Sequence, residues 1–262
     1  MQHSLTQGPI TKNILLFALP LLDGDSEIRM LSKLESKPYV DLTIACLRHF
    51  GIAVQETEQG YAVAGGQQYH ACDLTVEGDY SQAAFFCVAN ALGSDITLTN
   101  LNPESVQGDK KIVEIVREMC YNREQGLPAG FTVDAADIPD LVPILAVLAT
   151  FGTAPSSITG AHRLAIKESD RLASTADLLN RLGGKVTATP DGLEIEPVEH
   201  LHGGTVDSCG DHRIAMCAAV AATRCAGEVT ILHGECVEKS YPRFYEDYRQ
   251  LGGIANVIVL ES

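Results

Sequence analysis

The chain has 262 residues, 45% of them hydrophobic, and its 34 acidic and 19 basic side chains give a formal charge of −15. This length and composition are typical of a globular protein with one large or two modest domains, and they exclude disordered and fibrous classes. The negative charge argues against nucleic acid and anionic membranes as partners, since both repel such a chain at long range. It leaves open a small anionic ligand, because a local group of cations can outweigh a screened total charge.

The N-terminal region begins with an apolar stretch over residues 14–22. This stretch is too short to cross a membrane, and the acidic residues after it do not fit a signal-peptide cleavage site. A β-like run at residues 27–30 predicts a strand, and a stretch at residues 39–50, with a stop at Gly51, predicts a helix. These elements look like one clipped copy of a unit that recurs later in the chain.

From residue 73 onward the sequence contains a threefold repeat. The tripeptide Thr-Val-acid ends a short β-like run, which predicts a strand at residues 75–77, 132–134 and 205–207. It is followed each time by an Asp, and then by a mostly apolar stretch that stops at a glycine. The three copies run from Thr75 through Asp79 to Gly93, from Thr132 through Asp140 to Gly152, and from Thr205 through Asp211 to Gly227. An Asp at a helix start accepts hydrogen bonds from free amide groups, and a glycine just past the end permits a left-handed stop. Each stretch is therefore predicted to be a buried helix.

A second set of elements follows each buried helix. A β-rich run comes first, at residues 96–99, 157–159 and 229–232, and an amphipathic helix comes next, at residues 112–119, 172–182 and 244–251. Closing strands are predicted at residues 185–188 and 193–195, around a Pro-Asp-Gly turn. We therefore expect residues 73–262 to form a three-repeat domain and residues 1–72 to be the remainder of another domain.

The eight cysteines include no Cys-x-x-Cys pair, and several lie in apolar helical stretches. They are expected to be reduced and buried in a cytoplasmic protein, although an even number would also suit disulfides. The histidines show no metal-ligand spacing, and the glycine-rich nucleotide fingerprints are absent from the sequence. The sequence therefore predicts no metal and gives no support for ATP or NAD chemistry.

Two helix starts carry cations beside the Asp residues of the repeat. Residues 167–171, Lys-Glu-Ser-Asp-Arg, open the second amphipathic helix, and residues 210–213, Gly-Asp-His-Arg, open the third buried helix. Repeat symmetry would bring the Asp-bearing starts to equivalent places, where the helix dipoles favour an anion. Arg213 enters an apolar stretch, which is costly unless its guanidinium meets an anion.

An ordinary interpretation competes with an anion site. Asp79, Asp140 and Asp211 can be simple helix caps, and residues 167–171 can be a solvated helix start with Ser169 as its cap. The repeat pattern does not decide between the two interpretations.

Six short motifs occur in one order along the chain. They are Ser36-Lys37-Pro38-Tyr39, Gly78-Asp79-Tyr80-Ser81, Asp137-Ile138-Pro139-Asp140, Lys167-Glu168-Ser169-Asp170-Arg171, Gly210-Asp211-His212-Arg213 and Glu235-Cys236-Val237-Glu238-Lys239. This order resembles the 5-enolpyruvylshikimate-3-phosphate (EPSP) synthases, the 3-phosphoshikimate 1-carboxyvinyltransferases of aromatic amino-acid biosynthesis. The match covers roughly the C-terminal three fifths of that family. The sister family that transfers enolpyruvyl to UDP-N-acetylglucosamine is not expected to carry both the Lys-Glu-Ser-Asp-Arg and the Gly-Asp-His-Arg runs.

The resemblance implies an α/β fold of repeated βαβαββ units, the inside-out α/β barrel of the enolpyruvyl transferases. This chain would hold one complete three-repeat domain plus one unit of a second domain, with the active site between the domains. It also implies transfer of the enolpyruvyl group from phosphoenolpyruvate to the 5-hydroxyl of shikimate 3-phosphate, in the shikimate pathway and without a metal or organic cofactor.

The resemblance also implies a role for individual residues. Asp140 resembles the carboxylate that binds and deprotonates the attacking hydroxyl, and Glu168 resembles the acid/base next to the phosphoenolpyruvate methylene. Lys167 resembles the lysine that contacts the shikimate hydroxyls and the reaction centre, and Ser36 resembles a ligand of the shikimate phosphate. The cations that resemble the phosphoenolpyruvate ligands are Arg171, Arg213 and Lys239.

The chain has no counterpart of two further repeats, or of the Lys- and Arg-bearing segments that complete both substrate sites in the family. Residues 8–10, Gly-Pro-Ile, stand about where the family has Ser-Ser-Gln. We therefore expect a surviving half-site with weak or no turnover by this chain alone. Two alternatives stay open. One is a non-catalytic fragment that self-associates or binds a partner through the apolar faces of residues 10–72, and the other is complementation by a separately supplied N-terminal half.

Overall fold

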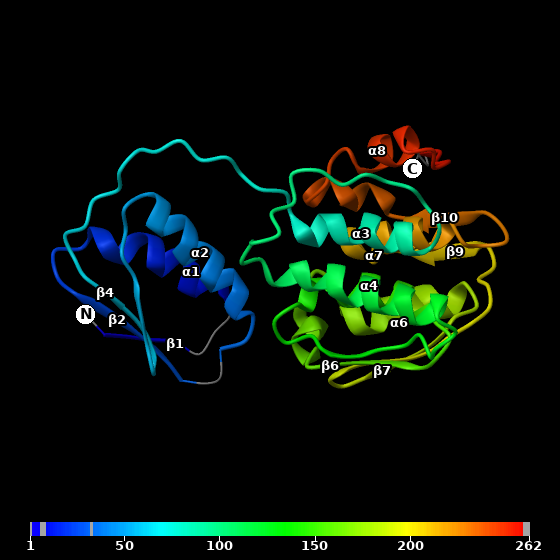
Figure 1. The fold of residues 1–262 in the computed structure, drawn as a ribbon, viewed down its shortest axis with the longest axis horizontal. Coiled ribbons are helices and arrows are strands. Elements are labelled where there is room, and N and C mark those ends of the chain that lie inside the picture. Colours follow the sequence, from blue (N-terminus) through cyan, green and yellow to red (C-terminus); the bar gives the residue numbers. More distant parts are fainter. Residues whose placement is uncertain (1, 6–8, 32–33, 259–262) are drawn as a thin grey trace. The chain divides into compact units, whose positions relative to one another are not determined.

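The computed structural model describes residues 2–5, 9–31 and 34–258, which form two compact units (Figure 1). Unit 1 comprises residues 1–78 with 100–110, and unit 2 comprises residues 79–99 with 111–262. The domain boundary expected after residue 72 stays a prediction.

Unit 1 contains a four-stranded sheet and two helices. Strands β1 (Gln2–Leu5), β2 (Ser26–Met30), β3 (Gln55–Thr57) and β4 (Gly60–Val63) pair in the order β1-β2-β4-β3, with β1 parallel to β2 and the other pairs antiparallel. Helix α1 (Pro9–Ala18), which runs into the 3-10 turn η1 (Leu19–Leu21), packs against α2 (Lys37–His49). The helices and the sheet share one core, which includes Leu16, Leu19, Ile28, Leu47 and Tyr61.

The copy that looked clipped in the sequence is a complete β-α-β-α-β-β unit. Both β2 and α2 were predicted, whereas β1, β3 and β4 were not. Strands β3 and β4 have three and four residues, and β3 is a polar edge strand, so neither carries the alternation by which a strand is recognised.

The second repeat, within unit 2, has the same topology as unit 1. Its elements are β5 (Thr132–Asp134), η3 (Pro139–Leu141), α5 (Val142–Thr150), β6 (Ser156–Thr159), η4 (His162–Ile166), α6 (Arg171–Arg181), β7 (Lys185–Thr189) and β8 (Gly192–Glu196). The strand order is β5-β6-β8-β7, again with the first pair parallel and the others antiparallel. The closing strands predicted from the Pro-Asp-Gly turn are confirmed as β7 and β8.

A glycine opens the last strand of both copies for the same steric reason. A Cβ atom at Gly60 would lie 2.0 Å from the carbonyl oxygen of Ile28, and one at Gly192 would lie 1.7 Å from the carbonyl oxygen of Ile158. No side chain fits where two backbones approach this closely. The two sheets therefore share a local contact as well as a strand order.

The first and third repeats are less regular. The first contains α3 (Tyr80–Ala91), η2 (Gly108–Lys110) and α4 (Lys111–Glu124), and the third contains β9 (Gly204–Asp207), α7 (His212–Ala222), β10 (Val229–Leu232), η5 (Gly234–Lys239) and α8 (Phe244–Gln250). The strands predicted at residues 75–77 and 96–99 are wrong, because both described segments lack strand pairing. Instead the amide of Gly78 donates to the carbonyl of Asn100 at 2.7 Å, and the Asn100 side chain donates to the carbonyl of Val76 at 3.1 Å.

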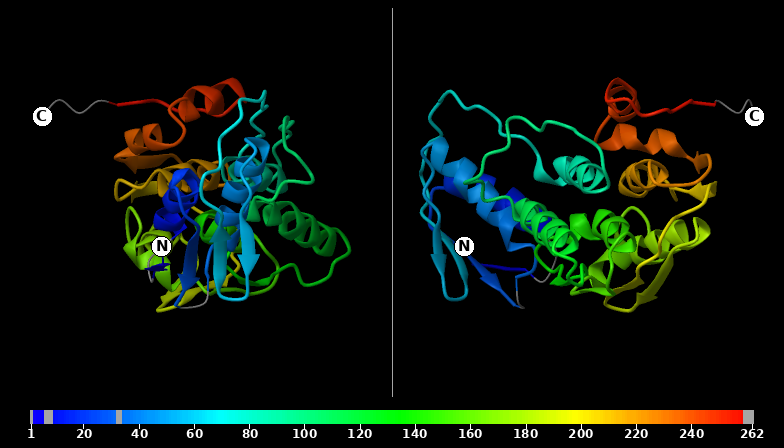
Figure 2. Two further views of the ribbon diagram at one scale, coloured as in Figure 1. Left: turned by 90° about the vertical axis from the view of Figure 1, so that its left-hand side faces the viewer. Right: turned by 45° about the vertical axis from the view of Figure 1, so that its right-hand side comes forward.

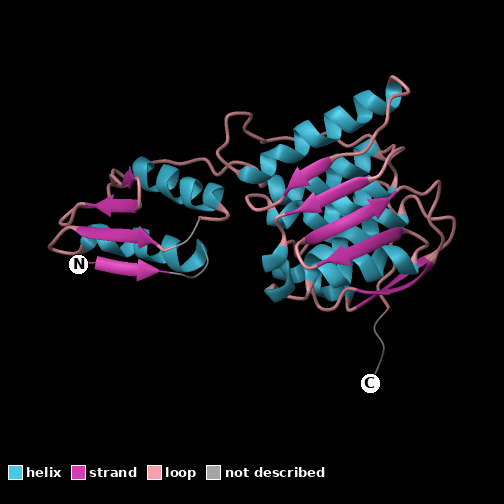
Figure 3. Ribbon diagram, turned by 90° about the horizontal axis from the view of Figure 1, so that it is seen from below, coloured by secondary structure: helices cyan, strands magenta, loops and turns pink. Residues whose placement is uncertain are grey.

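The three predicted buried helices, α3, α5 and α7, form the centre of unit 2. Each contacts the other two, and every residue of α5 is buried. Helices that are apolar all round are covered on every side, which is what the uninterrupted apolar stretches predicted. Figure 2 shows α3 and α7 side by side, and Figure 3 shows the strands of the unit outside its helices. This agrees with the inside-out arrangement that the resemblance implies, and the described residues form no closed barrel.

All eight cysteines are free, but the expectation that they are buried is wrong for most of them. Only Cys217 and Cys236 are buried, whereas Cys72 and Cys209 are exposed and the rest are half-buried. Among the helices in the described part of the chain, none is long and apolar enough to cross a membrane.

Candidate functional site

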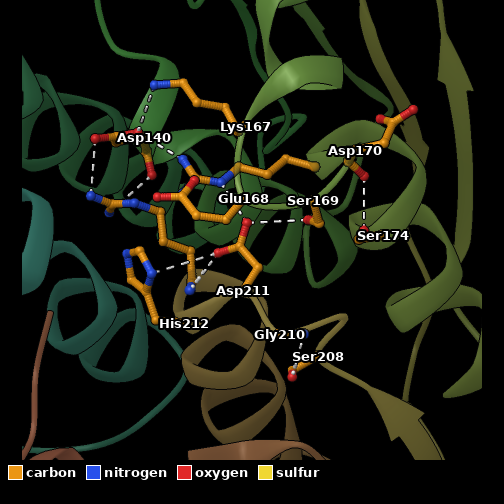
Figure 4. Close-up of polar contacts among 12 residues, drawn as sticks. Asp140, Lys167, Glu168, Ser169, Asp170, Ser174, Ser208, Gly210, Asp211 and His212 are labelled. Atoms are coloured by element: carbon orange, nitrogen blue, oxygen red, sulfur yellow. Dashed lines mark hydrogen bonds and ion pairs between the residues drawn. The ribbon is translucent and has the colours of Figure 1, made fainter. Parts of the chain in front are cut away.

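A cluster of charged side chains lies at the starts of three helices of unit 2. Asp140 lies in η3, just before α5, while residues 167–171 lead into α6 and residues 211–213 open α7. In Figure 4, Asp140, Glu168 and Asp211 point toward one another from these elements. We refer to the following six residues as the charge cluster: Asp140, Lys167, Glu168, Arg171, Asp211 and Arg213.

Arg171 is the centre of the charge cluster and is only 1% exposed. Each of its three nitrogens meets a different carboxylate: Nη1 lies 2.8 Å from Asp140 Oδ1, Nη2 lies 2.6 Å from Glu168 Oε2, and Nε lies 2.8 Å from Asp211 Oδ2. A buried guanidinium needs such partners, because an unpaired buried charge is costly. Arg171 therefore holds together three carboxylates that come from three separate helix starts.

Arg213 is the second buried cation and is 7% exposed. Its Nη2 lies 3.0 Å from Asp140 Oδ2, and its Nη1 donates to the Asp140 backbone carbonyl at 3.4 Å. Lys167 Nζ lies 3.9 Å from Asp140 Oδ1, so three cations surround one carboxylate. The anion that the apolar setting of Arg213 demands is, in this structure, the protein's own Asp140.

The Asp residues of the three repeats do not share one role. Asp79 caps α3 by accepting from the amide of Ser81 at 2.8 Å, and Asp211 caps α7 by accepting from the amide of Arg213 at 2.9 Å. No side-chain cap opens η3 or α5, and Asp140 is directed at the arginines instead. The cap interpretation is confirmed for Asp79, incomplete for Asp211 and wrong for Asp140.

The interpretation of residues 167–171 as a solvated helix start is confirmed for Lys167, Glu168 and Asp170, which are exposed, but the assignment of Ser169 as its cap is wrong. The cap of α6 is Asp170, whose carboxylate accepts from the amide of Ala173 at 3.1 Å. The hydroxyl of Ser169 donates instead to Asp211 Oδ2 at 3.2 Å. Of these five residues, only Arg171, which follows the cap directly, is buried.

Burial and ion pairing act in opposite directions on the pKa values of the cluster. Burial of Asp211 disfavours its charged form, but the hydrogen bond and charge of Arg171 outweigh burial and lower the pKa of Asp211. Burial likewise opposes the charge of Arg171, while its carboxylate partners raise its pKa above the ordinary value. The pKa of His212 is lowered, first by burial and then by the charge of Arg213. The Asp211–Arg171 pair is therefore ionised at neutral pH, next to a neutral imidazole.

The two remaining residues expected at the site lie outside the charge cluster. Lys239 is in η5, which packs against α7, and its Nζ donates to the carbonyl of Gly210 at 2.9 Å, in the turn just before that helix. Ser36 belongs to unit 1, where it precedes α2 with a φ of +56° and is 3% exposed. Its expected role as a shikimate phosphate ligand stays a prediction.

The arrangement offers two kinds of chemistry. The cations can bind an anionic ligand in exchange for their present partners, and the carboxylates can accept or donate protons. Within the described residues, no group of three or more His, Cys, Asp or Glu side chains is placed to hold a metal ion. Sequence reasoning did not detect the contact of Asp211 with Arg171 and Ser169. The available signal was an Asp placed directly before a His-Arg pair at the start of an apolar helix.

Comparisons with known proteins agree with the fold and with the order of the motifs. The chain matches the model of the family EPSP synthase (3-phosphoshikimate 1-carboxyvinyltransferase) over residues 8–248. The 3-phosphoshikimate 1-carboxyvinyltransferases of Clostridium kluyveri and Clostridium acetobutylicum are 44% and 45% identical to it over 249 and 247 residues, which is 91% of this chain and 58% of each relative.

Solved structures show the same relationship. The EPSP synthase of Acinetobacter baumannii superposes with a TM-score of 0.80 at 25% identity, over 96% of this chain and 62% of that one. The enolpyruvyl transferase NikO of Streptomyces tendae shares the fold, with a TM-score of 0.64 at 19% identity, over 91% of this chain and 58% of that one. The chain thus spans less than two thirds of the length of the relatives that it matches.

Proposed function

Because this chain belongs to the EPSP synthase family, we propose that it serves in the transfer of the enolpyruvyl group from phosphoenolpyruvate to the 5-hydroxyl of shikimate 3-phosphate. The observation that supports the proposal most directly is the convergence of Arg171 and Arg213 on one carboxylate, Asp140. Two neighbouring guanidinium groups suit a ligand that carries both a phosphate and a carboxylate, since each of these groups accepts paired N–H donors.

Phosphoenolpyruvate would bind by partial exchange of partners. The side chains of Asp140, Lys167 and Glu168 are 16%, 34% and 37% exposed, so a ligand can reach them, whereas the Arg171 side chain behind them is 2% exposed. A guanidinium has five N–H groups, and only some of those on Arg171 are taken by the carboxylates. Lys239, beside the start of α7, would be a third cation for the same ligand.

The reaction then needs one proton acceptor, one proton donor and stabilisation of the developing charge. As the shikimate oxygen bonds to C2, Asp140 would accept the hydroxyl proton and Glu168 would donate a proton to C3. In the second step the bond from C2 to the phosphate oxygen breaks, phosphate leaves, and C3 loses a proton so that the double bond returns. Lys167 and the arginines would stabilise the negative charge in both steps, and Ser36 would bind the shikimate phosphate.

The relatives contain a further portion that has no counterpart in these 262 residues, since the match covers 58% of their length. We therefore propose that this chain alone binds ligand weakly and turns it over slowly or not at all. Addition of the unmatched N-terminal portion of the Clostridium kluyveri enzyme would supply the missing repeats.

Isothermal titration of the chain with phosphoenolpyruvate, with and without shikimate 3-phosphate, tests the binding half of this proposal. A phosphate-release assay on the chain, alone and mixed with the N-terminal portion, tests the catalytic half. We expect binding by the chain alone and turnover only in the mixture. If phosphoenolpyruvate binds neither with nor without shikimate 3-phosphate, it is not the substrate. Rapid turnover by the chain alone would contradict the proposal that this chain holds only half of the site.

A second proposal concerns association through residues 10–72. Unit 1 exposes large apolar side chains along α1 and η1: Ile14 is 62% exposed, Phe17 is 45% exposed and Leu21 is 59% exposed. In unit 2 the equivalent helix, α5, is buried by α3 and α7. The occupant that fits this face is a pair of further repeats of the same kind. Sedimentation of the chain with the N-terminal portion is expected to show a one-to-one complex. A chain that stays monomeric in the mixture would contradict it.

A further inference from the structure

Asp211 differs from the other two carboxylates around Arg171 in one respect, which is its accessibility. Its side chain is 0% exposed, whereas those of Asp140 and Glu168 are 16% and 37% exposed. An exposed carboxylate can move aside when a ligand arrives, but a fully buried one in a packed interior cannot. Asp211 is therefore the partner that stays with Arg171 whether or not a ligand is present.

The two oxygens of Asp211 serve two different arginines. Oδ2 accepts from Arg171 Nε at 2.8 Å and from the Ser169 hydroxyl at 3.2 Å, while Oδ1 accepts from the backbone amide of Arg213 at 2.9 Å. The first contact fixes the rotation of the Arg171 guanidinium, because Nε is the nitrogen that joins the guanidinium to the rest of the side chain. The second contact fixes the first turn of α7, from which the Arg213 side chain extends.

We infer that Asp211 is a positioning residue that aligns both arginines for a phosphorylated carboxylic acid. It holds Arg171 through the side chain and Arg213 through the backbone, and so leaves Arg171 Nη1 and Arg213 Nη2 facing Asp140. This inference rests on the proposed function for the identity of the ligand. The alignment of the two arginines rests only on the contacts of Asp211 given above.

The substitution Asp211→Asn separates the two contacts. An amide has one acceptor oxygen, so it can cap α7 or accept from Arg171, but not both. If the oxygen keeps the cap, an NH2 group faces the N–H of Arg171, and two donors oppose each other. We therefore expect a variant that keeps its helix and loses the alignment of Arg171.

A matched control exists in the first repeat. Asp79 occupies the equivalent position, and its carboxylate caps α3 through the amide of Ser81 at 2.8 Å. Asparagine caps helices about as well as aspartate. Asp79→Asn is therefore expected to leave Arg171, the binding of phosphoenolpyruvate and the fold unchanged.

The first measurement reads the alignment without any ligand. The Nε–H of a hydrogen-bonded, buried arginine exchanges slowly with water and gives a resolved signal in a proton–nitrogen correlation spectrum. The Arg171 signal is assigned by its absence in Arg171→Lys. It is expected in the wild-type chain and in Asp79→Asn, and it is expected to be lost or strongly shifted in Asp211→Asn. An unchanged signal in Asp211→Asn would overturn the inference.

The second measurement is isothermal titration of the same three proteins with phosphoenolpyruvate. Asp211→Asn is expected to bind about tenfold more weakly or worse, since a misaligned guanidinium loses its paired contacts, and Asp79→Asn is expected to bind as the wild type does. Equal affinity of Asp211→Asn and the wild type would also overturn the inference. If the wild type itself does not bind phosphoenolpyruvate, the proposed function fails, and the Arg171 signal alone decides whether Asp211 aligns it.

Discussion

Arg213 Nη2 lies 3.0 Å from Asp140 Oδ2, although the two residues stand 73 positions apart in the sequence. This contact joins the starts of two buried helices that belong to different repeats. Together with the contacts of Arg171, it shows that both buried guanidinium groups of the site are already paired with carboxylates of the protein. An anionic ligand must therefore compete with Asp140 for them.

The fork geometry of Arg213 should matter more than its charge. We expect Arg213→Lys to weaken phosphoenolpyruvate binding by about tenfold, because lysine keeps the charge and loses the paired N–H groups. Titration calorimetry measures this directly. Arg181→Lys, on the exposed side of α6, is the control and should leave the affinity unchanged. Equal phosphoenolpyruvate affinities of the wild type and both variants would show that Arg213 does not bind this ligand.

Asp140→Asn separates proton transfer from binding. We expect turnover of the mixture with the N-terminal portion to fall by about 10²–10⁴-fold, which is typical of the loss of a general base. Phosphoenolpyruvate affinity should not fall, since the arginines lose a competing carboxylate. The exposed Asp177→Asn serves as the control. A variant of Asp140 that turns over normally would contradict the assigned role.

The buried pair of Arg171 and Asp211 should show strong coupling in stability. Arg171→Leu leaves the Asp211 carboxylate buried without its cation, and we expect the free energy of unfolding to fall by about 3–5 kcal/mol. The double variant Arg171→Leu/Asp211→Leu should lose less than the sum of the single variants. Urea unfolding at neutral pH measures all three, and additive losses would show that the pair is not coupled.

The lowered pKa of Asp211 predicts a specific loss of stability in acid. Its folded-state pKa lies below the unfolded value of about 3.9, so its contribution is fully present above that pH and disappears as the pH falls through the folded-state pKa. Asp211→Asn should therefore flatten the acidic limb of a plot of unfolding free energy against pH. Asp79→Asn is the comparison, and identical acidic limbs in the wild type and Asp211→Asn would contradict the shift.

Introducing a charged side chain tests whether the apolar face of unit 1 is the surface of association. Phe17→Asp should weaken association with the N-terminal portion, while the circular dichroism spectrum stays unchanged because Phe17 is 45% exposed. Val113→Asp places the same charge on α4 of unit 2, where Val113 is 43% exposed, and should not affect association. Equal association of both variants in sedimentation would mean that α1 is not the contact.

The helices of this chain were predictable because their signals are local. Asp79 and Asp211 cap the helices that follow them, and the uninterrupted apolar stretch of α5 marks a helix that is buried on all sides. Short strands were not predictable in the same way. Strand β3 is three polar or half-buried residues, and the β-like run at residues 96–99 finds no strand partner among the described residues.

The site was predictable in outline and not in its contacts. Repeat symmetry anticipates that the starts of α5 and α7 come together, and the cost of burying Arg213 anticipates an anion nearby. Which carboxylate meets which guanidinium depends on packing between elements far apart in the chain, as for Arg171 and Asp211. The cap of α6 was misassigned because Ser169 and Asp170 are adjacent and both residue types cap helices.

Gly60 and Gly192 lie beneath the carbonyl oxygens of Ile28 and Ile158, at the same point of two matching sheets. Backbone crowding alone therefore closes both positions to every other amino acid, whatever changes occur in the charge cluster. A variant that lost every side chain of the charge cluster would still need these two glycines for as long as it kept the fold.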